Sequence, residues 1–409
     1  MLLDRTDLRH VLALAASLLL AGCATPPTAY REPDTRGGTD CSAANLAVFD
    51  RVWSLVNDKY FDAALHGVDW PSLRSRYRPE AAAARDEKEL YGILNRMAAE
   101  LHDRHVCAIS PRQVHEQRQH HAIGFGFRER TLAASRTVTE VLRGSPAEAA
   151  GIRVGWRILA PNPIELDSLR YSEQAIHLSF LDEHDQPRAL TLSPTLLPLD
   201  DVRTDARLVA DGVLYLRFDE FTPESVSWLG RELQHHLAVP AVIIDLRENT
   251  GGASISLQRA ARLFFAEGRR LGEVIDRSGK PQPLDTLPTF SAPYSGKVVV
   301  LVGETTASSA EIFARALQWH RRATLIGQRT AGSVVEAFTH RLPDGGHLKV
   351  SERDFVDPAS QRLESHGVAP DVTAPCLTLA DICAGRDLAL ETALRLLPGI
   401  GSTPGVQTR

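Results

Sequence analysis

Residues 297–302 read KVVVLV, and residues 305–311 read TTASSAE. The first run is apolar apart from its leading lysine, which predicts a strand that is buried on both faces. After it, apolar side chains recur at helical spacing, which predicts a helix with one buried face. We expect that face to carry Ile312, Phe313, Ala316 and Leu317. Ser308 and Ser309 therefore lie in the first turn of a helix that follows a buried strand.

This serine pair has two interpretations. The first amides of a helix have no partner within the helix, and they carry partial positive charge. A serine at that position is either an ordinary N-cap or a nucleophile beside an oxyanion hole. Because caps far outnumber nucleophiles, this segment alone favours a cap, and the rest of the chain reverses that preference.

The overall composition excludes some classes of function. The chain has 409 residues, 43% of them hydrophobic and 24% charged, which is typical of a soluble globular protein with two or three domains. A net charge of -5 without a basic stripe argues against nucleic acid as a partner. No cysteine or histidine spacing matches a metal site, so we expect no metal and no other cofactor.

The N-terminus has the pattern of a targeting segment. Basic residues precede an apolar run, residues 11–21, which is too short to span a bilayer but suits a signal-peptide core. Residues 20–23 read LAGC and resemble a bacterial lipobox, so we expect residues 1–22 to be a lipoprotein signal peptide and Cys23 to be lipidated. The alternative is a plain secretory signal. Because Ala24 follows the cysteine, we expect a lipid-anchored protein of the bacterial cell envelope, facing the periplasm from the outer membrane.

The mature chain divides by pattern into five parts. Residues 23–40 predict a lipidated tether, 41–118 a helical N-terminal domain, 119–196 a β-rich domain, 197–397 an α/β core and 398–409 a disordered tail. The remaining cysteines permit two disulfides in three pairings in an oxidising compartment: Cys41, Cys107, Cys376 and Cys383.

Two runs in the β-rich part resemble a PDZ domain. Residues 123–127 read IGFGF, and residues 144–152 read GSPAEAAGI. The resemblance implies that the amides of one loop capture a peptide C-terminus while the peptide adds as a strand. That loop consists of Gly124, Phe125, Gly126 and Phe127. A closed spacer without a ligand is the alternative.

Beyond residue 205, strands alternate with helices, which predicts βα units and a covered, mostly parallel sheet. Strands are expected at 213–218, 241–246 and 297–302. A helix is expected at 223–237, with its inward face formed by Val226, Leu229, Leu233 and Leu237.

Further motifs occur in a fixed order: GVDW at 67–70, LHDRHV at 101–106, DLRENTGG at 245–252, TASSAE at 306–311 and GVAPDV at 367–372. Together with the PDZ-like runs they resemble the C-terminal processing, or tail-specific, serine peptidases over nearly the whole mature chain. The resemblance implies a multidomain α+β fold, with a small helical N-terminal domain, a PDZ-like β-rich domain and a crotonase-like α/β catalytic core. It also implies that Ser308 is the nucleophile.

The base of the reaction distinguishes two branches of this family. One branch uses a lysine in the motif TxGKG, but residues 330–334 here read TAGSV, with Ser333 in the lysine position. The chain instead resembles the tricorn-like branch, which implies His105 as the general base and Glu364 as the carboxylate that orients it. Neutral imidazole is a competent base near pH 7, and a carboxylate stabilises the imidazolium that forms. His366 or Glu352 is an alternative partner for His105.

The same resemblance places an oxyanion hole at the Ser309 amide and at the amide of Gly251 or Gly252, because glycine lets the backbone approach the substrate closely. Ser309 is the alternative nucleophile. We interpret three polar residues as structural supports of the glycine turn: Asp245, Arg247 and Asn249. Glu311 is interpreted as a support of the helix N-terminus.

Two functions are therefore weighed. The first is a periplasmic serine-type endopeptidase that cleaves unfolded or C-terminally exposed polypeptides by a Ser-His-Glu mechanism. The second is a catalytically silent, peptide-binding lipoprotein of the same fold. The presence of both His105 and Glu364 favours the enzyme, because a decayed lysine-dependent enzyme has no reason to carry them. A hydrolase of small esters or lactams is a more distant third.

Overall fold

The computed structural model describes residues 41–397 except 104, 119–120, 133–134, 162–174, 199–202, 289–291, 376–377, 379 and 382–383. Contacts divide the chain into residues 1–34 and 35–409, and everything described lies in the second unit. The predicted signal peptide, Cys23, the tether and the tail fall outside the described residues. Within the described part, no helix combines the length and the apolar character that a membrane span requires.

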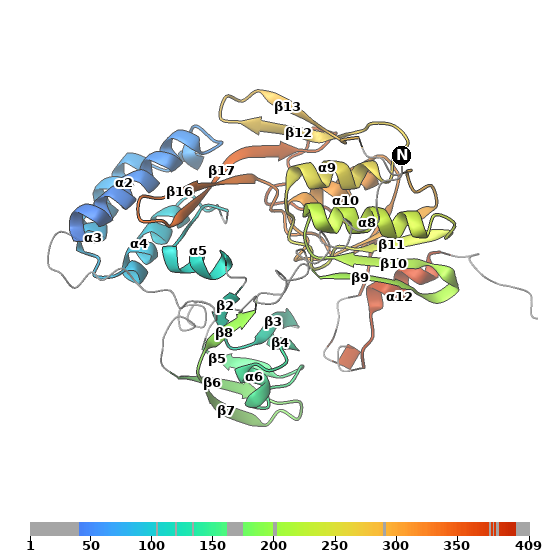
Figure 1. Cartoon of the computed structure of the whole chain (residues 1–409), viewed down its shortest axis with the longest axis horizontal. Helices are drawn as coiled ribbons and strands as arrows, with labels where there is room; N and C mark the ends of the chain where they lie inside the picture. Colours follow the sequence, from blue (N-terminus) through green and yellow to red (C-terminus); the bar gives the residue numbers. More distant parts are fainter. Residues whose placement is uncertain are drawn as a thin grey trace, which may run out of the picture. The chain divides into compact units, whose positions relative to one another are not determined.

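The N-terminal part consists of three helices, α2 (Cys41–Lys59), α3 (Trp70–Ala83) and α4 (Glu87–Ala99) (Figure 1). The side chains of Asp69 and Asp86 cap the second and third of them. Their apolar side chains are buried together, and the cluster also includes Leu348 and Val350 from far along the chain. The helical region therefore shares its core with a β-sheet. It does not form one by itself.

That sheet is antiparallel. Its strands run in the order β1 (Cys107–Ile109), β17 (His347–Val356), β12 (Arg270–Asp276) and β13 (Pro281–Asp285), and β16 (Glu336–Arg341) also pairs with β17. Cys107 is paired with Lys349 in this register. Between β1 and the PDZ-like part lies α5 (Pro111–Arg118). The pairing of β1 with β17 fixes the segment that carries His105 against the C-terminal half of the chain.

The PDZ-like part is a separate sheet with its own core. Its strands are β3 (Phe127–Leu132), β4 (Ser135–Val141), β5 (Arg157–Ala160), β6 (Ile176–Leu181) and β7 (Pro187–Leu192), in that order, with the short helix α6 (Pro146–Ala149). Two further strands, β2 (His121–Gly124) and β8 (Thr195–Pro198), pair with each other. Phe125, Val138, Trp156 and Phe180 are buried in its core. Among the described strands, β3 lies at an edge of this sheet.

The C-terminal sheet has six strands in the order β18 (Val372–Thr373), β15 (Thr324–Gly327), β14 (Lys297–Val302), β11 (Ala241–Asp245), β10 (Leu214–Phe218) and β9 (Thr204–Leu208). All neighbours are parallel except β9 and β10. The central strands are buried on both faces, as their continuous apolar runs predicted.

Helices cover both faces of this sheet (Figure 1). One face packs against α8 (Pro223–His235), α9 (Ser254–Arg262) and α10 (Ser309–Trp319), and the other against α12 (Leu388–Arg395). The prediction that Leu237 faces inward is wrong. Because α8 ends at His235, Leu237 is no longer on the helix face and is 43% exposed.

Candidate active site

Ser308 lies between β14 and α10, in a backbone conformation that L-residues rarely adopt. Its φ is 56° and its ψ is -125°. Such a conformation costs a non-glycine residue about 1–3 kcal/mol, and it persists only where the surroundings enforce it. Here the Ser308 N–H donates to the carbonyl of Ser333 at 2.7 Å and to the Glu311 carboxylate at 3.2 Å. Strained backbone conformations are found more often at active sites than elsewhere. The geometry of Ser308 therefore favours a nucleophile over an ordinary N-cap.

Glu311 joins the start of α10 to the loop at residues 330–333. Its side chain is fully buried, and burial raises its pKa although its hydrogen bonds oppose the change. The carboxylate accepts from the N–H groups of Gly332 and Ser333, both at 2.8 Å, and from the Thr330 hydroxyl. Glu311 thus supports the helix N-terminus, as its sequence position indicated, and it also fixes the backbone of Ser333.

Two amides beside Ser308 have no acceptor among the described residues. One is that of Ser309, in the first turn of α10, and the other is that of Gly252. The Gly251 N–H, in contrast, is buried and donates to the Asn249 side chain at 3.0 Å. Both free amides belong to residues that line one cavity with Ser308. Of the two glycines, Gly252 is therefore the better placed to stabilise an oxyanion.

The two glycines are required by both conformation and space. Gly251 has a φ of 110° and Gly252 a φ of 131°. A Cβ atom at Gly251 would lie 2.6 Å from the Ser308 Cβ, and one at Gly252 would lie 2.5 Å from the Phe221 carbonyl oxygen. The Ser309 hydroxyl donates to the Gly252 carbonyl at 2.9 Å. This hydrogen bond joins the glycine turn to α10. It also engages the hydroxyl of Ser309, the alternative nucleophile.

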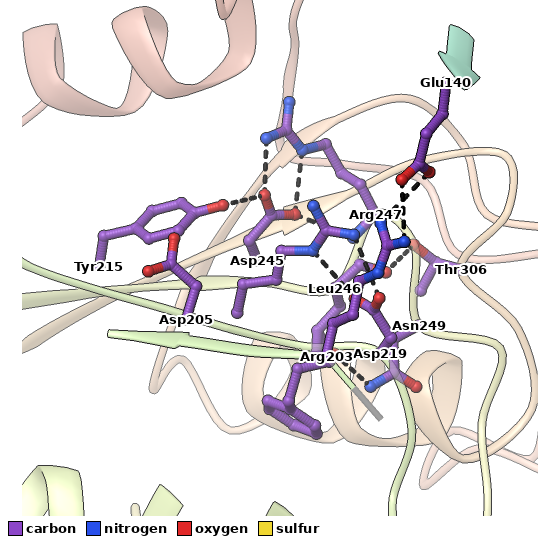
Figure 2. A network of polar contacts seen from close by, with 12 residues as sticks. Glu140, Arg203, Asp205, Tyr215, Asp219, Asp245, Leu246, Arg247, Asn249 and Thr306 are labelled. Carbon is purple, nitrogen blue, oxygen red and sulfur yellow. Dashed lines mark hydrogen bonds and ion pairs between the residues drawn. The ribbon is translucent and has the colours of Figure 1, made fainter. Parts of the chain in front are cut away.

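The polar cluster before the glycine turn has the geometry of a support (Figure 2). Asp245 accepts from the Tyr215 hydroxyl at 2.7 Å and forms an ion pair with Arg247 at 2.6 Å. Burial alone would raise the pKa of Asp245, but the Arg247 guanidinium outweighs it and holds that pKa below its ordinary value. Asn249 spans the turn by donating to the Phe218 carbonyl at 2.8 Å. These contacts agree with the structural role predicted for the cluster.

His105 lies just before β1, and a hydrogen bond from its backbone N–H holds it in place. Its N–H donates to the Asp103 carboxylate at 2.8 Å, which also accepts from the Tyr60 hydroxyl at 3.0 Å. Burial raises the pKa of Tyr60, and the Asp103 charge raises it further, so the phenol remains a donor. The ring Nε2 of His105 lies 2.8 Å from the Ser333 hydroxyl.

The structure does not join the three predicted catalytic side chains by hydrogen bonds. Within the described residues, Glu364 accepts from the amides of Val334 at 2.8 Å and Val335 at 3.2 Å, and no hydrogen bond links it to His105. The two alternative partners are also engaged elsewhere, because His366 contacts the Glu364 carbonyl and Glu352 pairs with His340.

One cavity of about 410 Å³ brings His105 and Ser308 together. Its polar wall includes Ser333, and its apolar wall includes Leu257, Ile312 and Phe355. Sequence reasoning missed the role of Ser333, although the lysine motif had singled out that position. It also missed two further residues of the cavity wall, Cys107 and Lys349.

Cys107 carries a free thiol whose pKa is raised by burial. An arrangement with two disulfides among the four expected cysteines is therefore not formed. Cys376 and Cys383 lie outside the described residues, as does the side chain of Cys41.

The predicted peptide loop of the PDZ-like part is tightly closed against α6. Gly126 has a φ of 87°, and a Cβ there would lie 2.0 Å from the Cβ of Ser145. The Ser145 hydroxyl donates to the Gly126 carbonyl, and Phe125 is buried. The loop runs from Gly124 directly into β3, whose outer edge no described strand covers. Such an edge is what an added peptide strand requires.

Comparisons with known proteins agree with this fold. Residues 212–374 match the model of Peptidase family S41, and residues 43–99 match that of the Tricorn protease C1 domain. The chain is thus a serine-type peptidase, and the part of it that matches family S41 spans the strands and helices around Ser308. The multidomain α+β fold expected from the sequence is thereby confirmed.

Its relatives include enzymes of two kinds. The chain is 28% identical over 372 residues to the carboxyl-terminal-processing protease of Synechocystis sp., covering 85% of each chain. It is 26% identical to tricorn protease homolog 1 of Streptomyces coelicolor, with 87% of this chain matching 35% of that larger protein.

Two solved structures are similar. The photosystem II D1 C-terminal processing protease superposes with a TM-score of 0.60 at 21% identity, over 87% of this chain and 97% of that one. Mature CPAF superposes with a TM-score of 0.63 at 14% identity, over 83% of this chain and 94% of that one. At such identities the likeness shows the fold.

Proposed function

We propose that this peptidase is an endopeptidase in which Ser308 attacks the scissile carbonyl and His105 is the general base. The observation that carries the proposal is the strained Ser308 beside two unpaired amides, in a cavity that also holds an imidazole. The amides of Ser309 and Gly252 would bind the oxyanion as it forms. Glu364 would support His105 through the loop that it helps to fix, because the same loop carries Ser333, the hydrogen-bond partner of His105.

The substrates we propose are unfolded or C-terminally exposed polypeptides. The edge of β3 and the loop before it would hold a peptide C-terminus, while a more distant segment of the same peptide enters the cavity. The relatives support this, since several are carboxyl-terminal-processing proteases. A peptide with an amidated C-terminus should then show a higher KM at an unchanged kcat. Equal KM values for the free and amidated peptides would contradict the role of the loop.

We also propose that the protein is anchored by lipid to the bacterial outer membrane and faces the periplasm. The ground for this proposal is the lipobox-like run that ends at Cys23. Radiolabelled palmitate should be incorporated into the wild type and not into Cys23→Ser. Incorporation into both would contradict the anchor.

The catalytic proposal can be tested with a fluorophosphonate probe, which reacts covalently with activated serines. Wild type, Ser308→Ala and His105→Ala would be compared as the mature chain without its lipid, with thermal unfolding to show that each variant is folded. We expect labelling of the wild type and its loss in both variants. Cleavage of an unfolded polypeptide should be lost in parallel.

The opposite outcome would favour the silent peptide-binding protein. A folded wild type that neither labels nor cleaves, even with unfolded polypeptide present to occupy the PDZ-like part, would contradict the enzyme mechanism. Labelling that persists in Ser308→Ala would move the nucleophile to another serine, with Ser309 tested next.

A further inference from the structure

Ser333 makes three contacts with the groups of the mechanism above, which gives it no chemical step of its own. Its hydroxyl lies 2.8 Å from the His105 Nε2. Its carbonyl accepts the Ser308 N–H at 2.7 Å, and its own N–H donates to Glu311 at 2.8 Å. The residue is thus bound by its side chain to the base and by its backbone to the nucleophile.

The backbone around Ser333 is unusually well fixed. Four consecutive amides, those of residues 332–335, all donate to two carboxylates. Glu311 receives the first two, and Glu364 receives the last two. A loop held in this way keeps its side chains in fixed positions. A functional residue requires such a fixed position, whereas a loop that only joins two elements does not.

We propose that Ser333 is a proton relay between Ser308 and His105, an inference that rests on the function proposed above. A hydroxyl can accept one hydrogen bond while it donates another. Ser333 can therefore take a proton from Ser308 as it gives its own to His105. The ring nitrogen of His105 faces Ser333, and all three residues line the same cavity. Among the described residues, no hydrogen bond joins the Ser308 hydroxyl to His105 or to the Ser333 hydroxyl, so the relay requires the Ser308 side chain to turn toward Ser333 when substrate binds.

The relay conserves protons and electrons at each stage. The Ser308 Oγ forms a bond to the carbonyl carbon, and the π electron pair of the carbonyl moves to its oxygen. The Ser308 proton passes to the Ser333 Oγ while the Ser333 proton passes to the His105 Nε2. The imidazolium then returns its proton to the Ser333 Oγ while Ser333 gives its own proton to the leaving amine. The electron pair on the oxyanion re-forms the carbonyl, and the C–N electron pair leaves with the amine.

The experiment compares Ser333→Ala and Ser333→Thr with Ser308→Ala and His105→Ala. Ser227→Ala is the control for loss of a hydroxyl, because Ser227 is exposed on α8 and its hydroxyl donates to the Pro223 carbonyl of the same helix. Peptide cleavage is measured as kcat and KM, and in mixtures of H2O and D2O. Removing one general acid-base group typically costs a factor of about 10²–10⁴, so we expect Ser333→Ala to lower kcat within that range at a nearly constant KM.

The isotope measurement separates a relay from a structural role. Two protons in flight make the rate curve downward with the D2O fraction, and one proton makes it linear. We expect a curved plot for the wild type and for Ser333→Thr, which keeps the hydroxyl, and a linear plot for Ser333→Ala. If Ser333→Ala does not fold, Ser333→Cys takes its place in the experiment. Cysteine nearly keeps the volume of serine, but its thiol is a weak hydrogen-bond donor.

Each of the remaining results contradicts either the relay or the proposed function. If Ser333→Ala cleaves at the wild-type rate while Ser308→Ala and His105→Ala are inactive, the relay is wrong and the proposed function stands. A low kcat with a plot that is still curved also contradicts the relay. If Ser308→Ala or His105→Ala keeps its activity, the proposed function itself fails.

Discussion

At the scale of single residues, Ser308 shows how the site opposes the preferences of its own backbone. An ordinary N-cap residue has extended φ and ψ angles, as Thr222 has before α8. Ser308 instead has a positive φ, held by hydrogen bonds from its N–H to two neighbours. Contacts elsewhere in the fold offset the free energy that this conformation costs. The conformation places the Ser308 hydroxyl beside the free amides of Ser309 and Gly252.

Replacing Ser308 by glycine should therefore stabilise the chain relative to replacing it by alanine. Glycine adopts a positive φ without the steric cost of about 1–3 kcal/mol, although it loses about 0.5–1 kcal/mol through its greater freedom when unfolded. We expect Ser308→Gly to unfold in urea with a free energy about 1 kcal/mol above that of Ser308→Ala. Both variants should be inactive. An equal or lower stability of the glycine variant would show that the backbone at 308 is not strained.

At the scale of elements, the end of β11 is a charged cluster that positions the glycine turn. Asp245 is the last residue of the strand, and it is bound to Arg247 and to Tyr215 of the neighbouring strand β10. Arg247 continues the cluster to Asp387, the N-cap of α12. Hydrogen bonds and ion pairs thus join the sheet to a helix on its other face at the point where the glycine turn begins.

This cluster predicts a dependence of stability on pH. The folded-state pKa of Asp245 lies below its unfolded value near 3.8. Its stabilisation is therefore complete above the unfolded pKa and is lost as the pH falls through the folded pKa. Asp245→Asn should lower the free energy of unfolding by about 1–3 kcal/mol at pH 7, because Arg247 loses its buried partner and keeps only the ion pair with Asp387. Urea unfolding between about pH 7 and about pH 2.5 should show a flatter curve for the variant.

A matched control is Asp285→Asn. Asp285 pairs with Arg270 on the surface, where its side chain is 52% exposed. Such pairs contribute about 0–1 kcal/mol, so this variant should follow the wild-type curve. A pH curve for Asp245→Asn as steep as that of the wild type would assign the acid sensitivity to other carboxylates.

The same elements show what could be predicted from the sequence. The strand at 297–302 and the buried face of the following helix were predicted correctly, because a continuous apolar run and helical spacing are local signals. The contact between His105 and Ser333 joins residues 228 positions apart, and no local pattern encodes such a pair. Glu364 was predicted to face His105, whereas its described contacts are backbone amides, which carry no residue-type signature in a motif.

At the scale of the whole molecule, the first helices and a late strand share one core. Leu348 of β17 is fully buried among side chains of α2, α3 and α4. The same strand pairs with β1, which begins two residues after His105. The position of His105, the proposed base, therefore depends on a strand more than 200 residues further along the chain.

Leu348→Ala tests this dependence. Truncating a buried leucine costs about 2–5 kcal/mol, and here the cavity would open beneath the N-terminal helices. We expect faster amide hydrogen exchange in α2 to α4 and a lower kcat. Leu208→Ala is the control, since Leu208 is 58% exposed on β9 and should change neither quantity. Unchanged exchange in the helices of Leu348→Ala would show that their core does not need β17.

The shared core also sets the order in which the chain can become active during its synthesis. A ribosome that has reached residue 340 has already produced both His105 and Ser308, but not the strand that holds β1 and completes the packing of the first three helices. Until β17 is present, the proposed base His105 has no fixed position opposite Ser308. A chain that ends before β17 should therefore lack peptidase activity.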